Sequence, residues 1–520
     1  MEEPLHKLDL SKMNLEADVE VLIRRLLNHI EIMNKELEEL KEEKQRLRDE
    51  VSRLKGEKGK PDVKGNKKAK EKLPREGSKL GAKKSKRQED KKQRKERIEI
   101  DKEEVIELAE EEKEKLPADA KHSGYREITI QNIRWERINT RYRLERYYSA
   151  SENKTYEAEI PEGIKGQGGY GIDLQAMVIT LYFEQRVPEE KIVEFLKSQG
   201  IEISAGQVSN ILIKKHVEKF EEERKEVVKA GLGSTEYQHI DETGARVDGQ
   251  NQYTTTVCNE HYGVFYTNEK KNKETVEKLL AEELKEELEE GKTKIEGERF
   301  SVGDKESTVK EEVIQEDITL REKIPILIAD DAPQFHDQTK HRGLCWVHED
   351  RHYKKLKPYF EHHQKLIEDV RERYWELYRQ GLEYKEAPTE EFKQELNQSF
   401  DELFGMETGY EELDKRLELT KAKKEHMMLF LEFPEIPLDN NEAERALREF
   451  VVKRKISNGT RVKDGTKAWD VFLSLANTCR KQGVNFYQYI KDRISGKQEL
   501  PSLASLIYSN SQTEIVHDTS

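Results

Sequence analysis

Three acidic positions stand where metal-dependent phosphodiester chemistry needs carboxylates. Asp241 lies in the strand-like run HIDETG (239–244), Asp330 directly follows the apolar run ILIA, and Glu444 lies in NNEAERALR (440–448). Carboxylate oxygens suit Mg2+ or Mn2+, and two such ions can activate a water and stabilise the leaving oxygen of a phosphodiester. A lone aspartate at a strand end is more often a turn cap, so the prediction depends on all three positions together.

Two glutamates compete for the third position in PLDNNEAERALREF (437–450). At about 100° per residue, Glu442 and Glu444 fall on opposite flanks of the apolar stripe of a helix, which is formed by Ala443, Ala446, Leu447, Phe450 and Val451. Asp439 as N-cap would place Glu442 at the third helical position, as in a capping box. This gives Glu442 a structural role and leaves Glu444, with Asn441 and Arg448 on its flank, as the metal-ligand candidate.

The elements around these acids follow an order of strands and helices. Three β-rich runs, EYQHIDETGARV, NQYTTTVCNE and YGVFYTNE, precede a helical segment and then the short buried strand of IPILIADDAPQF. Strand, strand, strand, helix, strand is the start of a ribonuclease-H-like fold. Asp241 would lie within the first strand and Asp330 where the fourth ends, so both would reach one sheet. Residues 353–433 are charged and helical in pattern, which predicts a helical insertion before Glu444.

The N-terminal region predicts a coiled coil. Its a positions are Ile23, Ile30, Leu37, Lys44 and Val51, and its d positions are Leu26, Met33, Leu40, Leu47 and Leu54. Branched residues at a with leucine at d favour a parallel two-stranded coiled coil, and hence a homodimer or higher oligomer. The alternative is one amphipathic helix packed on a domain.

Charge is unevenly distributed along the 520 residues. The net charge is −14, yet residues 55–97 hold 19 lysines and arginines against 7 acidic residues, a net of +12 that leaves −26 for the remainder. This basic block predicts a disordered linker that attracts a polyanion or serves only as a tether. A helix is predicted over 101–115.

The totals exclude several protein classes. There is no run of about 18 apolar residues and no secretory pattern at the start, so we expect no membrane association and a cytoplasmic, nucleoid-associated protein. Three cysteines without paired spacing exclude a disulfide framework and a four-cysteine zinc site.

A DNA-binding region is predicted between the linker and the first acid. Residues 125–160 mix arginines with aromatics, which suits either nucleic-acid contact or cross-strand pairing in a small sheet. Residues 171–216 read as helices, with a break at Gly200 and a capping box formed by Ser204 and the third residue after it. This is the pattern of a helix-turn-helix, although many helical hairpins bind nothing. The second helix would turn three side chains to a DNA groove: Gln207, Asn210 and Lys214.

The ordered set HIDETG, ADDAPQF (329–335), CWVH (345–348), NNEAERALR and VVKRK (451–455) resembles transposases of the insertion sequence 66 family. These are prokaryotic DDE recombinases, and the resemblance spans roughly residues 120–495. It implies that Asp241, Asp330 and Glu444 are an acidic triad holding two Mg2+ or Mn2+ ions. Asp330 is preferred to Asp331 because the family pattern has its aspartate five places before an aromatic.

The resemblance also implies partners and reactions. We expect cleavage of insertion-element ends, joining to target DNA, and a possible need for accessory element-encoded proteins. The basic residues beside the third acid are candidates for phosphate contact, with a solvated helix end as the alternative: Arg445, Arg448, Lys453, Arg454 and Lys455. Many relatives carry a paired-cysteine, zinc-finger-like segment, but this chain has no CxxC. Cys345 and His348 are therefore expected to pack and position the site, not to bind zinc.

The sequence thus predicts a multidomain α+β protein. Its parts are a coiled coil (15–55), a basic linker (56–100), a DNA-binding region with a helix-turn-helix (120–225), a ribonuclease-H-like catalytic domain in two parts (236–352 and 434–496), the helical insertion between them (353–433), and a tail (497–520). Two other functions remain open: a non-catalytic DNA-binding regulator, and a ribonuclease-H-like nuclease without strand transfer.

Overall fold

The computed structural model describes residues 16–54, 99–109, 136–161, 169–277 and 325–517, with a few short stretches between 117 and 133. The chain divides into two compact units, one of residues 1–35 and 137–520 and the other of residues 36–136. Most of the predicted basic linker and the end of the predicted tail lie outside the described residues. The division into seven parts along the chain stays a prediction.

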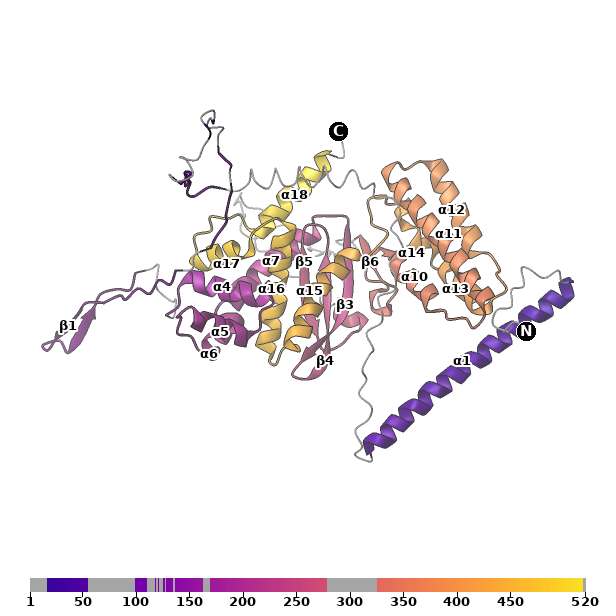
Figure 1. Ribbon diagram of the computed structural model, residues 1–520, viewed down its shortest axis with the longest axis horizontal. Helices are drawn as coiled ribbons and strands as arrows, with labels where there is room; N and C mark the ends of the chain where they lie inside the picture. Colours follow the sequence, from indigo (N-terminus) through magenta and orange to yellow (C-terminus); the bar gives the residue numbers. More distant parts are fainter. Residues whose placement is uncertain are drawn as a thin grey trace, which may run out of the picture. The chain divides into compact units, whose positions relative to one another are not determined.

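A five-stranded mixed sheet forms the centre of the larger unit (Figure 1). Its strands, in the spatial order β5-β4-β3-β6-β7, are β3 (Tyr237–Val247), β4 (Gln250–Cys258), β5 (Gly263–Asn268), β6 (Ile326–Ala329) and β7 (His341–Leu344). The first three strands pair antiparallel, whereas β6 runs parallel to β3 and β7 parallel to β6. Asp248 (φ 48°) and Gly249 (φ 72°) close the β3–β4 hairpin with the left-handed backbone that a two-residue turn requires. The chain is therefore of the α+β class, as predicted.

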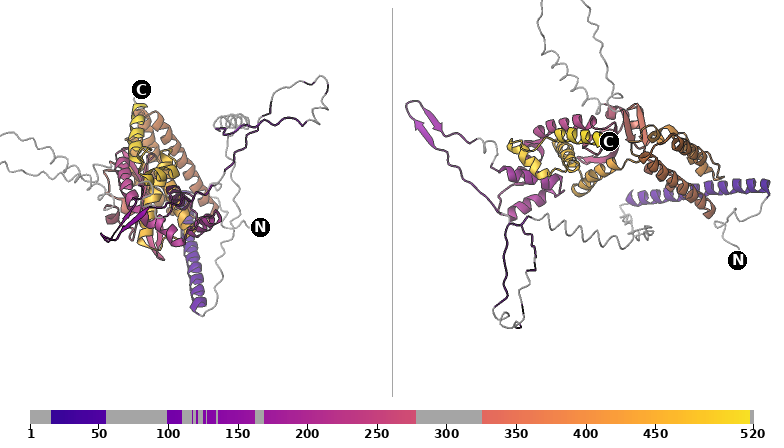
Figure 2. Two further views of the ribbon diagram at one scale, coloured as in Figure 1. Left: turned by 90° about the vertical axis from the view of Figure 1, so that its left-hand side faces the viewer. Right: turned by 90° about the horizontal axis from the view of Figure 1, so that it is seen from above.

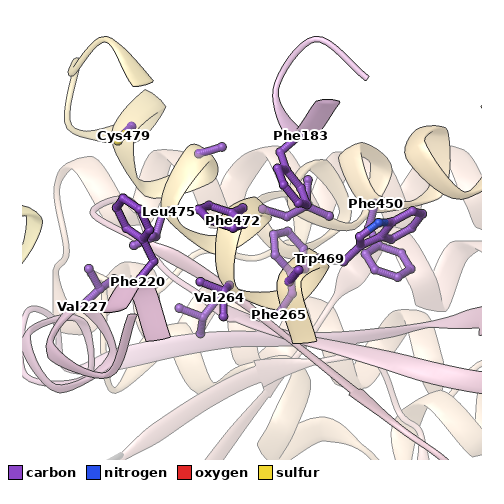
Figure 3. Packing of buried hydrophobic residues seen from close by; sticks show 14 of the residues in the cluster. Phe183, Phe220, Val227, Val264, Phe265, Phe450, Trp469, Phe472, Leu475 and Cys479 are labelled. Atoms are coloured by element: carbon purple, nitrogen blue, oxygen red, sulfur yellow. The ribbon is translucent and has the colours of Figure 1, made fainter. Parts of the chain in front are cut away.

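Side chains of β6 point alternately into two hydrophobic cores. Leu327 and Ala329 belong to a core with α15 (Asn441–Ser457) and α16 (Lys463–Lys481). Figure 3 shows this core around Phe472, with Phe183 and Phe220 beside it. Ile326 and Ile328 belong to the other core, which is built mainly from the helices that follow β7. The strand that ends at Asp330 is thus buried on both faces.

Those helices lie between β7 and α15 in the sequence and form a helical layer. They are α10 (Trp346–Lys355), α11 (Glu361–Glu386), α12 (Glu390–Phe404), α13 (Glu411–Lys421) and α14 (Lys424–Met427). Figures 1 and 2 show α11 and α12 side by side. Trp346 anchors the layer, since it is fully buried and donates from its indole to the carbonyl of Met427 at 2.9 Å. The predicted helical character of 353–433 is confirmed.

Helices also precede the sheet, at α4 (Ile172–Phe183), α5 (Glu189–Ser198), α6 (Ala205–Asn210), the π-helical turn η4 (Ile211–Lys215) and α7 (Val217–Leu232). The predicted break falls at Gly200, whose φ of 74° suits glycine. The capping box is confirmed, because Ser204 and Gln207 each accept the other's backbone amide proton. Before these helices, β1 (Arg146–Ser149) and β2 (Lys154–Glu157) form an exposed antiparallel hairpin, and after α16 the chain continues through α17 (Phe486–Ser495) and α18 (Leu503–His517).

The predicted heptad segment forms one helix, α1 (Ala17–Leu54). Near its start, Leu27 is buried against Phe360, with Ile23 and Ile30 beside them. The d residues Leu26 and Met33 nevertheless remain exposed. Further along α1, Leu37, Leu40, Leu47 and Val51 are exposed too. One face of the helix therefore packs within the chain, as in the alternative above, and this packing includes the seam residues Ile23 and Ile30, while the seam from Met33 to Val51 stays exposed.

The acidic segment at residues 102–109 differs from its prediction. Residues 102–109 form no helix, so the predicted helix over 101–115 is wrong there; this acidic segment is exposed along its length, and local propensity without burial is weak. In the parts that the structure describes, no helix is long and apolar enough to cross a membrane.

Glu31 is expected to hold the start of α11. Its carboxylate accepts from the backbone amides of Tyr359 (2.8 Å) and Phe360 (3.1 Å) and contacts His363 Nδ1 at 3.0 Å. Glu31→Ala would leave these buried donors without their acceptor, at a cost of about 1–3 kcal/mol. We expect amide exchange at 359–363 to quicken by about 10–100-fold. The control is Glu38→Ala, which removes an exposed carboxylate of the same helix; equal exchange in both variants would contradict the assignment.

Candidate active site

Asp241 occupies a half-buried position in the middle of β3, opposite Thr256 of β4. Its Oδ1 accepts from the backbone amide of Glu242 at 2.7 Å. Burial raises the pKa of Asp241 to about 7; the amide opposes this shift, and the negative charges of Asp330 and Glu444 add to it. The three predicted acids, 89 and 114 residues apart in the sequence, thus lie near enough to repel one another.

The two adjacent aspartates after β6 differ in their partners. Asp331 pairs with Lys423 at 2.7 Å and with Arg342 at 3.4 Å, and together these cations outweigh burial and hold its pKa below the usual range. Asp330 accepts from the amide of Ala332 at 3.2 Å, and among the described residues no cationic side chain forms an ion pair with it. Asp331 is therefore neutralised within the protein, whereas Asp330 is available to a ligand.

The two glutamates of α15 also differ, but not through the predicted cap. The helix begins at Asn441 with Asn440 as N-cap, so Glu442 is its second residue and no capping box forms. Asp439 accepts from the amide of Asn441 at 3.0 Å, which makes a local turn in place of the cap. Glu442 instead pairs with Arg445 at 2.6 Å and Lys481 at 2.9 Å. Its role is structural, as predicted, but for a different reason.

Glu444 is held by two side chains of α10. Arg351 Nη2 lies 2.6 Å and His348 Nε2 lies 3.3 Å from the same oxygen, Oε1. Burial and the charge of Arg351 lower the pKa of His348, so the imidazole is neutral at pH 7 and its contact with Glu444 is not an ion pair. The CWVH segment thus positions the third acid. Cys345 is buried nearby with its thiol pKa raised by burial to about 11, which fits a packing role.

The donor set suits a hard divalent cation. Asp241 and Asp330 form no ion pair among the described residues, and oxygen ligands of this kind favour Mg2+ or Mn2+. Across the described ranges, however, no three His, Cys, Asp or Glu side chains are arranged to hold one ion. Glu444, the third carboxylate, is paired with Arg351 of the protein.

The three residues predicted to face a DNA groove lie on the surface of α6 and η4. Asn210 and Lys214 are exposed. Gln207 is exposed as well, but its Oε1 accepts from the backbone amide of Ser204 and from Tyr170 Oη at 2.6 Å. The capping box thus uses the group that was predicted to read a base, and Gln207 is the weakest of the three candidates.

The predicted basic contacts beside Glu444 fall into three groups. Arg445, Arg448 and Lys455 are exposed on α15. Arg454 is half-buried and covers β3 at Gly244, where a Cβ atom would lie 3.3 Å from its Nη1. Lys453 is fully buried: its Nζ donates to the carbonyl of Tyr182 at 2.6 Å and lies 3.2 Å from the centroid of the Tyr182 ring. This corrects the prediction for Lys453, which packs inside the protein and cannot touch DNA from there.

The chain is similar in sequence to known proteins. The family profile described as "Transposase IS66 family" matches residues 167–291 and 326–468, which is just over half of the chain and includes all three acids. The chain belongs to the IS66 family of transposases. It is also similar to the uncharacterized protein y4jO of Sinorhizobium fredii (strain NBRC 101917 / NGR234), with 38% identity over 183 residues. That match covers 35% of this chain and 56% of the relative.

Three residues near the candidate site were not predicted from the sequence as site residues: Arg351, Asn440 and Gln334. Arg351 follows CWVH by three positions, so the helical spacing from His348 could have placed both on one face of α10. Asn440 was treated as part of a helix start, yet it is fully buried and contacts β3. No local pattern marks Gln334 as a partner of Glu242, 92 residues earlier.

The contrast between Lys453 and Lys455 is testable. We expect Lys455→Met to weaken DNA binding and to reduce the slope of log K against log salt concentration by about 1, because one phosphate contact is lost. Lys453→Met should leave that slope unchanged, since the buried ammonium contacts Tyr182. Fluorescence anisotropy at several salt concentrations measures both. A slope that falls for Lys453→Met and not for Lys455→Met would reverse the assignment.

Proposed function

We propose that this chain is a DNA transposase that cuts insertion-element ends and joins them to target DNA. The observation that carries the proposal is the convergence of Asp241, Asp330 and Glu444 in a chain of the IS66 family. Hydrolysis would break a P–O bond at the element's end and leave a 3′-hydroxyl. That hydroxyl would then attack a target phosphorus, forming one P–O bond while another breaks.

The sheet topology supports a ribonuclease-H-like catalytic domain. Three antiparallel strands followed by two strands parallel to the first give the order β5-β4-β3-β6-β7, with the first acid inside the central strand. Asp330 leaves the adjacent parallel strand at its carboxyl end. Glu444 comes from α15, which packs on β3 and β4. This arrangement lets three distant segments supply one site.

The three carboxylates are the proposed ligands of two Mg2+ or Mn2+ ions. Such ions, when bound, stabilise the attacking and leaving oxygens of an in-line displacement at phosphorus. The chain itself contributes the buried position of Asp241, the local turn that holds Asp330, and the two side chains that orient Glu444. Arg351 must release Glu444 for the third carboxylate to bind an ion, and a DNA phosphate is a natural alternative partner for an exposed guanidinium.

DNA recognition is proposed for the helices before the sheet and for the exposed part of α15. The pair α5 and α6, with its turn at Gly200, supports a helix-turn-helix in which Asn210 and Lys214 approach bases or phosphates. Arg445, Arg448 and Lys455 are exposed on the helix that carries Glu444, so they would contact phosphates beside the reacting bond.

Dimerisation through α1 is the proposed basis of oligomer formation. The seam residues Leu37, Leu40, Leu47 and Val51 are 47%, 70%, 55% and 48% exposed, and an apolar stripe of this spacing is covered best by a second copy of the same helix. Any requirement for accessory proteins stays an expectation.

Substitution of the acids tests the enzyme proposal. We expect Glu444→Gln to reduce end cleavage by more than the 10–100-fold typical of indirect ligand effects, because a charged ligand is lost. Glu442→Gln is the matched control, two residues earlier on the opposite flank of the same helix, and should keep cleavage within about tenfold of the wild type. The assay uses paired element ends with Mn2+ and scores cut and joined products. Equal loss in both variants would refute the choice of Glu444.

The same assay separates the two alternative functions. Cutting without joined product would favour a nuclease, and binding without cutting would favour a regulator.

The seam of α1 is tested by Leu40→Asp with Leu47→Asp. Two buried charges per helix would face each other across the seam, so we expect the dimer to dissociate in sedimentation velocity at micromolar concentration. Gln45→Asp with Arg46→Asp, at the outward b and c positions of the heptad, is the control and should remain dimeric. A wild-type monomer at that concentration would contradict dimerisation through α1.

A further inference from the structure

Two buried residues flank Asp241 in β3, and each reaches toward a segment that carries another acid. His239 Nδ1 lies 2.8 Å from Asn440 Oδ1, directly before the helix of Glu444. Glu242 Oε2 accepts from Gln334 Nε2 at 2.8 Å, in the turn η5 (Pro333–Phe335) that follows Asp330. The strand of the first acid is thus hydrogen-bonded through side chains to the segments of the other two.

Asn440 makes the denser of these connections. It is fully buried, and its Nδ2 donates to the carbonyl of Ile240 at 2.9 Å, so its Oδ1 is the acceptor for His239. The donor in this bond is therefore His239 Nδ1. The amide of Asn440 donates to Cys345 Sγ at 3.2 Å, and its carbonyl accepts from the amide of Glu444 at 3.1 Å. One residue therefore joins β3, the start of α10 and the first turn of α15.

Glu242 makes the second connection with a buried charge. Its side chain is 2% exposed, and besides Gln334 it accepts from Thr255 Oγ1 at 3.0 Å, with Lys271 Nζ at 3.4 Å. Gln334 is 7% exposed, and its carbonyl accepts from Gln338 Nε2 at 3.0 Å. A charge-assisted bond in such a buried place is directional and stronger than at the surface, so it constrains where the turn after Asp330 can lie.

We propose that Asn440 and the Glu242–Gln334 pair are positioning residues that set the relative placement of the three carboxylates. The inference rests on the proposed function, because a metal site is what would require this placement. The hydrogen bonds themselves are present in the chain whatever its function. Apolar packing of α15 on the sheet is not directional, whereas displacement of a reacting group by about 1 Å can cost about 100-fold in rate. The hydrogen bonds from β3 to the segments that carry Asp330 and Glu444 are directional, so they can fix the positions of these segments relative to Asp241.

Exchanging the two side chains of the Glu242–Gln334 pair tests whether their hydrogen bond holds the turn after Asp330. Gln334→Glu alone places two carboxylates together in a buried site, so it should push the turn away from β3. Adding Glu242→Gln restores one amide and one carboxylate with the direction of the bond reversed. We expect Gln334→Glu to weaken Mn2+ binding, followed by electron paramagnetic resonance, by about 10–100-fold, and the double variant to recover most of it. Asn440→Ala should weaken Mn2+ binding to a similar degree.

The matched control is Gln238→Glu. Gln238 is 1% exposed in the same strand, but it bonds Tyr262 Oη at 2.9 Å and the carbonyl of Gly231, away from the acids. This variant should lower the thermal unfolding midpoint while leaving Mn2+ affinity unchanged. If Gln334→Glu and Gln238→Glu lose stability alike and both keep Mn2+ affinity, or if the double variant recovers nothing, the proposal is wrong.

Amide exchange without metal separates this proposal from the proposed function. Gln334→Glu should speed exchange at 332–336, and Asn440→Ala at 441–446, with recovery at 332–336 in the double variant. If the wild type binds no Mn2+, the proposed function fails while the exchange data still decide the connections. Unchanged exchange in both variants would overturn the positioning role even if the wild type binds Mn2+.

Discussion

Repulsion among three carboxylates is the constraint on which the candidate site of this protein depends. Asp241, Asp330 and Glu444 approach one another closely enough for the last two to raise the pKa of the first. Folding gains nothing from this contact in the absence of a cation, so packing and hydrogen bonds elsewhere must compensate for it. The mixed sheet, α15 and the helical layer after β7 supply that compensation.

The acidic residues next to the candidate site differ from the three acids of the site in their ion-pair partners. Asp331 and Glu442 sit within two residues of the acids of the site, yet each is neutralised by two basic side chains. Asp241 and Asp330 form no such pair among the described residues, and Glu444 has only Arg351 and a neutral His348. The protein therefore pairs Asp331 and Glu442 with cations of its own, whereas Asp241 and Asp330, where metal ions are proposed to bind, keep no ion-pair partner among the described residues.

Reasoning from sequence recovered what depends on local pattern. The strands around Asp241, the buried run before Asp330, the helix of Glu444, the capping box at Ser204 and the helical character of 353–433 all follow from periodicity and cap chemistry. The acids themselves came from motif order and family resemblance, and their convergence is a property of the sheet topology. The long heptad segment was correctly read as a helix, although its partial docking near Phe360 required tertiary contacts that no spacing reveals.

The failures have the same cause. Lys453 looked like a surface cation, but α15 turns it toward Tyr182. Asp439 looked like a helix cap, but Asn440 takes that place because its side chain is required by His239 and Ile240. The DNA contact of Gln207 stays a prediction, although its Oε1 is already used by its own helix cap. In each case a contact with a distant residue, or a second use for one polar group, outweighed the local preference.

The central claim is that these three carboxylates form one metal site. A crystal structure of the chain with element-end DNA and Mn2+, with anomalous scattering data at the manganese edge, tests it most directly. The account predicts manganese peaks at about 2.0–2.3 Å from carboxylate oxygens of Asp241, Asp330 and Glu444, with Arg351 turned away from Glu444. Manganese at Glu442 or Asp331, or three carboxylates that hold no ion beside bound DNA, would contradict it.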